Sequence, residues 1–310
     1  MLQLSLAEQL YTIFRDPLAK TLLKLIIKQE QPLEPHELRS ILNYAFKNKV
    51  LLLLLNGFPK LEPRLYMKLS NQRERFLCAL KIAASVFVKE RVKFVVFKTL
   101  RPVPDAPVDI DLLVPNRKCL LEAIAILRKH FKVEIWSTDV YSAGLRLPDI
   151  GEYIDIYFKP HVANFVYLNN NMILKNPRYF ELDEVRIPLP SFEAEALSIV
   201  AHSIIKEQLV TLNDIISVAV LLEQGDFAIF IKLARSSHLL PAVKVFFESL
   251  TSPGFPHRIS YKSLFKAMLS RVYDAETIES LPAFLCVLPS KVLHVPEHSK
   301  RETYLRGLNR

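Results

Sequence analysis

Val108-Asp109-Ile110-Asp111-Leu112-Leu113-Val114 is the most informative segment of this 310-residue chain. Its apolar and β-branched residues predict a strand over 108–114. Side chains alternate between the two faces of a strand, so Asp109 and Asp111 share one face while Ile110 points to the other. Two such carboxylates can converge on a divalent cation or can simply face solvent. Because Asp is disfavoured in strands, the pair favours a functional site.

A third acidic residue lies in a second apolar stretch, Glu152-Tyr153-Ile154-Asp155-Ile156-Tyr157-Phe158, which also predicts a strand. Three carboxylates gathered on one sheet repel each other. One of them becomes protonated unless a cation compensates the negative charge. Mg²⁺ and Mn²⁺ suit ligation by oxygen atoms alone and leave coordination positions open for phosphate oxygens. The sequence therefore predicts a metal site built from Asp109, Asp111 and Asp155.

The acidic strands belong to a short segment of mixed helix and strand with helical regions on both sides. Hydrophobic spacing and Pro positions divide the chain into a helical region over 1–90, a sheet region over 91–189 and a second helical region over 190–310. In the first region we expect helices over 36–55 and 65–88. In the second we expect strands over 92–97, 108–114, 132–136 and 152–158 and a helix over 118–131. In the third we expect helices from 191 onward, including 215–223, 226–236, 239–249, 261–272 and 275–281. The fold class expected is α+β.

Composition narrows the choice of partner and compartment. The formal net charge of +9 favours phosphate-bearing partners, although a modestly basic ordinary surface fits it equally well. The basic tail Ser299–Arg310 is the most concentrated positive stretch. Three widely spaced cysteines show no zinc spacing, so we expect reduced thiols, no zinc and a cytoplasmic protein. No apolar run approaches the roughly 20 residues of a membrane span, and we expect no membrane partner and no signal peptide.

The order of these motifs resembles the DNA polymerase β-like nucleotidyltransferase superfamily. Its members carry a strand and a phosphate-binding turn, then two Asp residues alternating with apolar ones, then a later acidic strand. The matching stretches here are Phe94–Leu100, Val108–Val114 and Ile154-Asp155-Ile156. The chain is most similar to an uncharacterised nucleotidyltransferase family with a helical C-terminal region, whose His and Leu-x-Asp resemble Ala201-His202 and Leu212-Asn213-Asp214. The resemblance spans roughly 36–250.

The resemblance implies an α+β fold with a small mixed-sheet nucleotidyltransferase core. It also implies transfer of a nucleoside monophosphate from a nucleoside triphosphate (NTP) such as ATP to a hydroxyl acceptor, with release of pyrophosphate. Asp109, Asp111 and Asp155 would be the catalytic metal ligands for Mg²⁺ or Mn²⁺, and Lys98, Thr99 and Arg101 would bind the nucleotide. The acceptor could be RNA, protein or a small molecule.

Two departures from the family pattern keep a second interpretation open. The turn Lys98-Thr99-Leu100 lacks the family's Gly, which allows close backbone approach to phosphates. Tyr157 stands where relatives often have His. The alternative is therefore a catalytically inactive nucleotidyltransferase-fold module that binds nucleotide or a partner.

Four other residues are weaker candidates for the site. His202 lies on an apolar stripe, where a buried structural histidine is more common than a catalytic base. Asp214 has a structural role available, because Thr211 and Asp214 form a capping-box pattern. His161 follows the third acidic strand, and Arg117 follows the paired motif.

Overall fold

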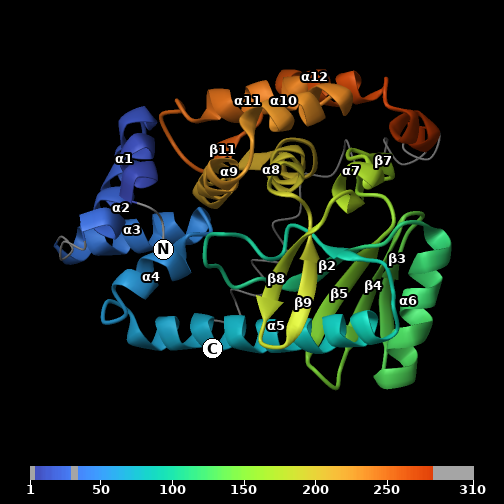
Figure 1. Ribbon diagram of the computed structural model, residues 1–310. Helices are drawn as coiled ribbons and strands as arrows, with labels where there is room; N and C mark the ends of the chain where they lie inside the picture. Colours follow the sequence, from blue (N-terminus) through green and yellow to red (C-terminus); the bar gives the residue numbers. More distant parts are fainter. Residues whose placement is uncertain (1–3, 29–33, 282–310) are drawn as a thin grey trace.

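The computed structural model describes residues 4–28 and 34–281, which form a mixed α+β protein. Figure 1 shows the small sheet with helix α5 running beneath it and the C-terminal helices above it. The N-terminal helices α1 to α4 lie to one side of the sheet. Cys286 and the basic tail Ser299–Arg310 lie outside the described residues. No helix in the described ranges is both long and apolar enough to cross a membrane.

The N-terminal region is helical, as expected; the helix expected over 65–88 is confirmed as α5, whereas the one expected over 36–55 is divided in two. The helices are α1 (Leu4–Ile13), α2 (Pro17–Lys28), α3 (Pro35–Lys47), α4 (Leu51–Gly57) and α5 (Pro63–Lys89). The single helix expected over 36–55 is wrong, because the chain breaks after Lys47 and Lys49 adopts a left-handed backbone with φ of 59°. Asn48 holds the break in place: its side-chain amide donates to the Tyr44 carbonyl, and its Oδ1 accepts from the Leu212 backbone N–H.

The central sheet has five strands in the order β1-β2-β5-β4-β3. Their bounds are β1 (Val95–Val96), β2 (Asp109–Leu113), β3 (Glu134–Thr138), β4 (Ser142–Leu147) and β5 (Glu152–Tyr157). Only the β2–β5 pair is parallel; β1–β2, β4–β5 and β3–β4 are antiparallel. Strands β2 and β5 confirm the two acidic strands, and α6 (Arg117–His130) confirms the helix between them.

Strand β4 was not expected from the sequence. Its residues Ser142-Ala-Gly-Leu-Arg-Leu147 contain Gly144, which weakens a strand pattern, and they lie between turn-forming residues. Two further hairpins were also missed because their strands are short or polar. They pair β6 (His161–Val162) with β7 (Phe165–Val166) and β8 (Arg178–Leu182) with β9 (Val185–Leu189), with the short helix α7 (Asn170–Leu174) between them.

The two faces of the sheet pack differently. Ile110, Ile154 and Ile156 point to one face and pack with buried residues of α5 and α6 in one hydrophobic cluster. On the opposite face, Leu113 and Tyr157 enter a second cluster that the N-terminal and C-terminal helices share. Asp109, Asp111 and Asp155 lie on this second face, which we call the acidic face.

The C-terminal region is helical, as the sequence predicted. It contains α8 (Phe192–Ala201), the π-helix η1 (His202–Glu207), α9 (Leu212–Gln224), α10 (Phe227–Ser236), α11 (Leu240–Ser249) and α12 (Tyr261–Arg271), with residues 275–281 also helical. A short pair of β10 (Leu209–Val210) and β11 (His257–Arg258) interrupts it. The predicted capping box is present: the Thr211 side chain accepts from the Asp214 N–H, and Asp214 accepts from the Thr211 N–H.

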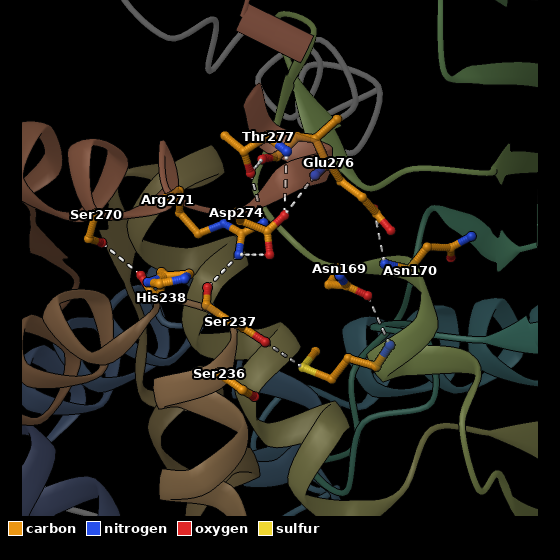
Figure 2. Close-up of polar contacts among 12 residues, drawn as sticks. Asn169, Asn170, Ser236, Ser237, His238, Ser270, Arg271, Asp274, Glu276 and Thr277 are labelled. Carbon is orange, nitrogen blue, oxygen red and sulfur yellow. Dashed lines mark hydrogen bonds and ion pairs between the residues drawn. The ribbon is translucent and has the colours of Figure 1, made fainter. Parts of the chain in front are cut away.

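A buried arginine fastens the last helices to the rest of this region. The Arg271 guanidinium is fully buried; it donates to the Ser237 carbonyl and to Thr277 Oγ1 at 2.8 Å, and it pairs with Asp274 at 3.1 Å (Figure 2). Thr277 in turn donates to the Val166 carbonyl at 2.7 Å. A buried charge needs such partners, so this group joins α12 and the end of α10 to strand β7.

Candidate active site

The three predicted acidic residues lie side by side on the acidic face. Strands β2 and β5 run parallel with Asp111 directly opposite Asp155, and Asp109 lies two residues earlier on β2. Directly opposed residues of paired strands point to the same face, so all three side chains share it. The expectation that these residues occupy adjacent strands and one face is therefore confirmed.

Burial and the crowding of carboxyl groups on this face raise the pKa of two of them. Burial, with added repulsion from Asp111 and then Asp155, raises the pKa of Asp109 to about 7. Burial and the charge of Asp111 also raise the pKa of Asp155. Its Oδ2 accepts a hydrogen bond from the Tyr157 hydroxyl at 3.2 Å, while its Oδ1 is buried with no hydrogen-bond partner among the described residues.

These observations allow a test of whether the residues fit a divalent cation. An unpartnered buried carboxylate oxygen and three neighbouring acids have the charge and the oxygen donors that Mg²⁺ or Mn²⁺ requires. Their spacing is wider than a metal centre needs: within residues 4–28 and 34–281, no three His, Cys, Asp or Glu side chains form a group that could hold one ion. The donor chemistry fits, and the side chains would have to move closer together around the ion.

Lys98 supplies positive charge on the acidic face. Its side chain is only 4% exposed, and its Nζ lies 3.2 Å from Asp111 Oδ1. The ammonium also lies 4.5 Å from the ring centre of Phe97 and 5.1 Å from that of Tyr157. Lys98 has a φ of 64°, a left-handed conformation that favours glycine. The left-handed position of the turn Lys98-Thr99-Leu100, which lacks the family's Gly, is therefore Lys98.

Thr99 and Arg101 are both engaged within the protein. Thr99 is buried, and its Oγ1 accepts a hydrogen bond from the Asp111 backbone N–H at 2.9 Å. Arg101 pairs with Asp214 at 2.5 Å and donates to Asn213 Oδ1 at 3.3 Å. Both side chains of the Arg101–Asp214 pair are less than 10% exposed. Arg101 thus ties the turn to the start of α9 in the C-terminal region.

Of the weaker candidates, the two histidines are enclosed by the protein and Arg117 is exposed. Burial and then the nearby Lys98 charge lower the pKa of His202 to about 4, and its ring contacts the Tyr167 hydroxyl at 3.3 Å and Glu207 at 3.2 Å. His161 is buried against Asp139 with 2.6 Å between Nε2 and Oδ2. Arg117 is the first residue of α6 and is exposed.

Lys206 is a site residue that sequence reasoning missed. It lies on the π-helix η1, half-buried, with its Nζ 6.0 Å from the ring centre of Tyr157. Its charge lowers the pKa of both Asp109 and Asp155. The available sequence signal was its position four residues after His202, but a π-helical turn, which decides where Lys206 points, has no clear sequence pattern.

Comparison with known proteins gives no relative from which a role for these residues could be inferred. No model of a known protein family matches the chain, and no curated protein is significantly similar to it.

Proposed function

We propose that this chain is a metal-dependent nucleotidyltransferase. It would transfer a nucleoside monophosphate from an NTP to a hydroxyl acceptor and release pyrophosphate. The observation that carries the proposal is the register of β2 and β5, which sets Asp155 directly opposite Asp111 with Asp109 on the same face. Neighbouring carboxylates with an unpartnered buried oxygen are what a phosphate-transfer site needs to hold Mg²⁺ or Mn²⁺.

The roles of the residues follow from their positions. Asp109, Asp111 and Asp155 would hold the metal, which when bound neutralises charge on the phosphate oxygens. Asp155, whose Oδ1 has no other partner among the described residues, would also orient the acceptor hydroxyl. The neutral ring of His202 would pack behind the site and take no proton at physiological pH.

The phosphate groups would be met by Lys206. Lys98, Thr99 and Arg101 already bond to Asp111 and Asp214, whereas Lys206 makes no ion pair with another described residue. A Lys206→Met variant should therefore bind MgATP roughly tenfold to a hundredfold more weakly, and Lys206→Arg should recover most of the loss. Calorimetric titration measures this, with the exposed Lys232→Met on α10 as a control for the lost charge. Equal affinity in all four proteins would remove Lys206 from the site.

One observation favours the second candidate, an inactive nucleotidyltransferase-fold module that binds nucleotide or a partner. The Lys98 ammonium is bonded to Asp111, so a metal ion must compete with it for that carboxylate. In this alternative Lys98 is a permanent counter-ion, and the fold binds without catalysing transfer.

A transfer assay separates the two candidates. Purified protein is incubated with labelled NTPs, Mn²⁺ or Mg²⁺, and pooled RNA, protein and small-molecule acceptors. The enzyme proposal predicts labelled product from wild type and near-complete loss in Asp111→Asn and Asp155→Asn. Asp183→Asn, at an exposed position in the turn of the separate β8–β9 hairpin, should keep full activity. Absence of transfer with NTP still bound would favour the binding module, and undiminished transfer in both site variants would exclude this site.

A further inference from the structure

Two aromatic side chains lie exposed beside the carboxylates. Trp136 on β3 is 44% exposed and Tyr153 on β5 is 38% exposed. Their rings meet edge to face, with 6.0 Å between ring centres and 83° between ring planes. Exposing large aromatic surface to water is unfavourable, so a paired, outward-facing set marks a surface suited to a planar ligand.

Strand register places this aromatic pair on the acidic face. Tyr153 lies directly opposite Asp109 in the β2–β5 pairing and two residues before Asp155, so its side chain shares their face. On the next strand, Gly144 lies directly opposite Asp155. A Cβ atom at Gly144 would come within 2.6 Å of Trp136 Nε1, so only glycine leaves room for the indole above β4.

Both rings lie close to the carboxylates: Tyr153 is directly opposite Asp109, and the Trp136 indole lies over Gly144, which is directly opposite Asp155. Trp136 lies on the second strand from β5, and two strand spacings amount to roughly 10 Å. The register of β3 against β4 shifts between Ile135 and Ser137, and the Trp136 ring lies over Gly144. A base resting on these rings would therefore have its own phosphates or hydroxyl within reach of Asp155.

We propose that Trp136 and Tyr153 form a stacking surface for a nucleobase. The proposal rests on the proposed function, since it assumes that the acidic face takes nucleotides. The base could belong to the NTP or to the terminal nucleotide of an RNA acceptor, and the stacking chemistry is the same in both.

The protein carries its own probe for this surface, because Trp136 is the only tryptophan in the chain. Its fluorescence is recorded during titration with MgATP, with magnesium tripolyphosphate, and with a five-adenosine RNA. Quenching by MgATP alone assigns the base to the NTP, and quenching by the RNA assigns it to the acceptor. Tripolyphosphate has no base and should leave the emission unchanged. No change with either base-containing ligand, or equal changes with tripolyphosphate, would overturn the proposal.

Matched variants test the second ring. Tyr153→Ala should weaken binding of the quenching ligand roughly tenfold, while Tyr153→Phe keeps the ring and the affinity. Tyr179→Ala removes a more exposed tyrosine from β8 and should have no effect. Equal affinity in Tyr153→Ala and wild type would contradict the proposal. These measurements do not depend on product formation. Base-dependent quenching without nucleotide transfer would support the stacking surface and reject the enzyme proposal. Nucleotide transfer without quenching would support the enzyme proposal and reject the stacking surface.

Discussion

The pKa of Asp109 is raised well above that of an ordinary aspartate. Its pKa of about 7 in the folded protein lies above the ordinary value near 3.8, chiefly because of burial and then because of Asp111 and Asp155. A raised carboxyl pKa means that the folded state holds a proton that the unfolded state releases. The stabilising contribution is therefore complete below about pH 3.8 and is lost as pH rises towards 7.

This linkage predicts a pH-dependent gain in stability for Asp109→Asn. Asn cannot ionise, so the variant escapes the loss that wild type suffers as pH rises. We expect its melting temperature to exceed that of wild type by a few °C at pH 8. The difference should shrink towards pH 4.5, where Asp109 is protonated in the folded protein. Thermal melts at both pH values, without divalent ions, measure it; a difference that grows towards acid pH would contradict the account.

Thr99 holds the turn against the paired acidic strand. Its Oγ1 accepts from the Asp111 backbone N–H, and Thr99 itself is buried. Thr99→Val keeps the shape but leaves that N–H without an acceptor, which should lower the free energy of unfolding by about 1–3 kcal/mol. Thr99→Ser keeps the hydroxyl and should lose less. Urea denaturation of the two variants gives the comparison, and equal losses would mean that only the methyl group matters.

At the scale of elements, the paired strands β2 and β5 were predictable because their apolar residues alternate around each Asp. Strand β4 was not, because Gly144 and Arg146 break the β pattern. Its pairing with β5 comes from long-range packing that no local pattern encodes. The break at Lys49 was hidden for a similar reason: Asn48 is held by Leu212, more than 160 residues away in the chain. Likewise, the two apolar stretches predicted that the three acids lie on strands, but only the β2–β5 register brings Asp155 opposite Asp111.

Gly144 and Gly57 offer a matched test of the β3–β4 packing. A Cβ at Gly144 would lie 2.3 Å from Ser137 Oγ and 2.6 Å from Trp136 Nε1, whereas one at Gly57 meets nothing within 4 Å. Gly144→Ala should therefore destabilise the protein by about 1–3 kcal/mol. Gly57→Ala, at the end of α4, should be neutral or stabilise it by up to about 1 kcal/mol. Denaturant midpoints measure both, and a Gly144→Ala midpoint at or above that of wild type would refute the close packing.

At the scale of the whole molecule, the sheet and the C-terminal helices meet at the acidic face. Arg101 connects the turn after β1 to Asp214 on α9, and the Lys206 ammonium on η1 lies 6.0 Å from the Tyr157 ring centre, where its charge lowers the pKa of Asp109 and Asp155. The acids come from the sheet and one of the cations from the helices. Movement of the C-terminal helices relative to the sheet would therefore change the charge around Asp155.

The central claim is that the acidic face binds a divalent cation. Mn²⁺ binding, followed by the loss of the free-ion electron paramagnetic resonance signal, tests it most directly. We expect binding by wild type, binding about tenfold weaker or worse in Asp155→Asn, and unchanged binding in the Asp183→Asn control. Lys98→Met, which frees Asp111 from its ammonium partner, should bind Mn²⁺ more tightly than wild type. Equal Mn²⁺ affinity in wild type and Asp155→Asn, or no binding by either wild type or Lys98→Met, would contradict the claim.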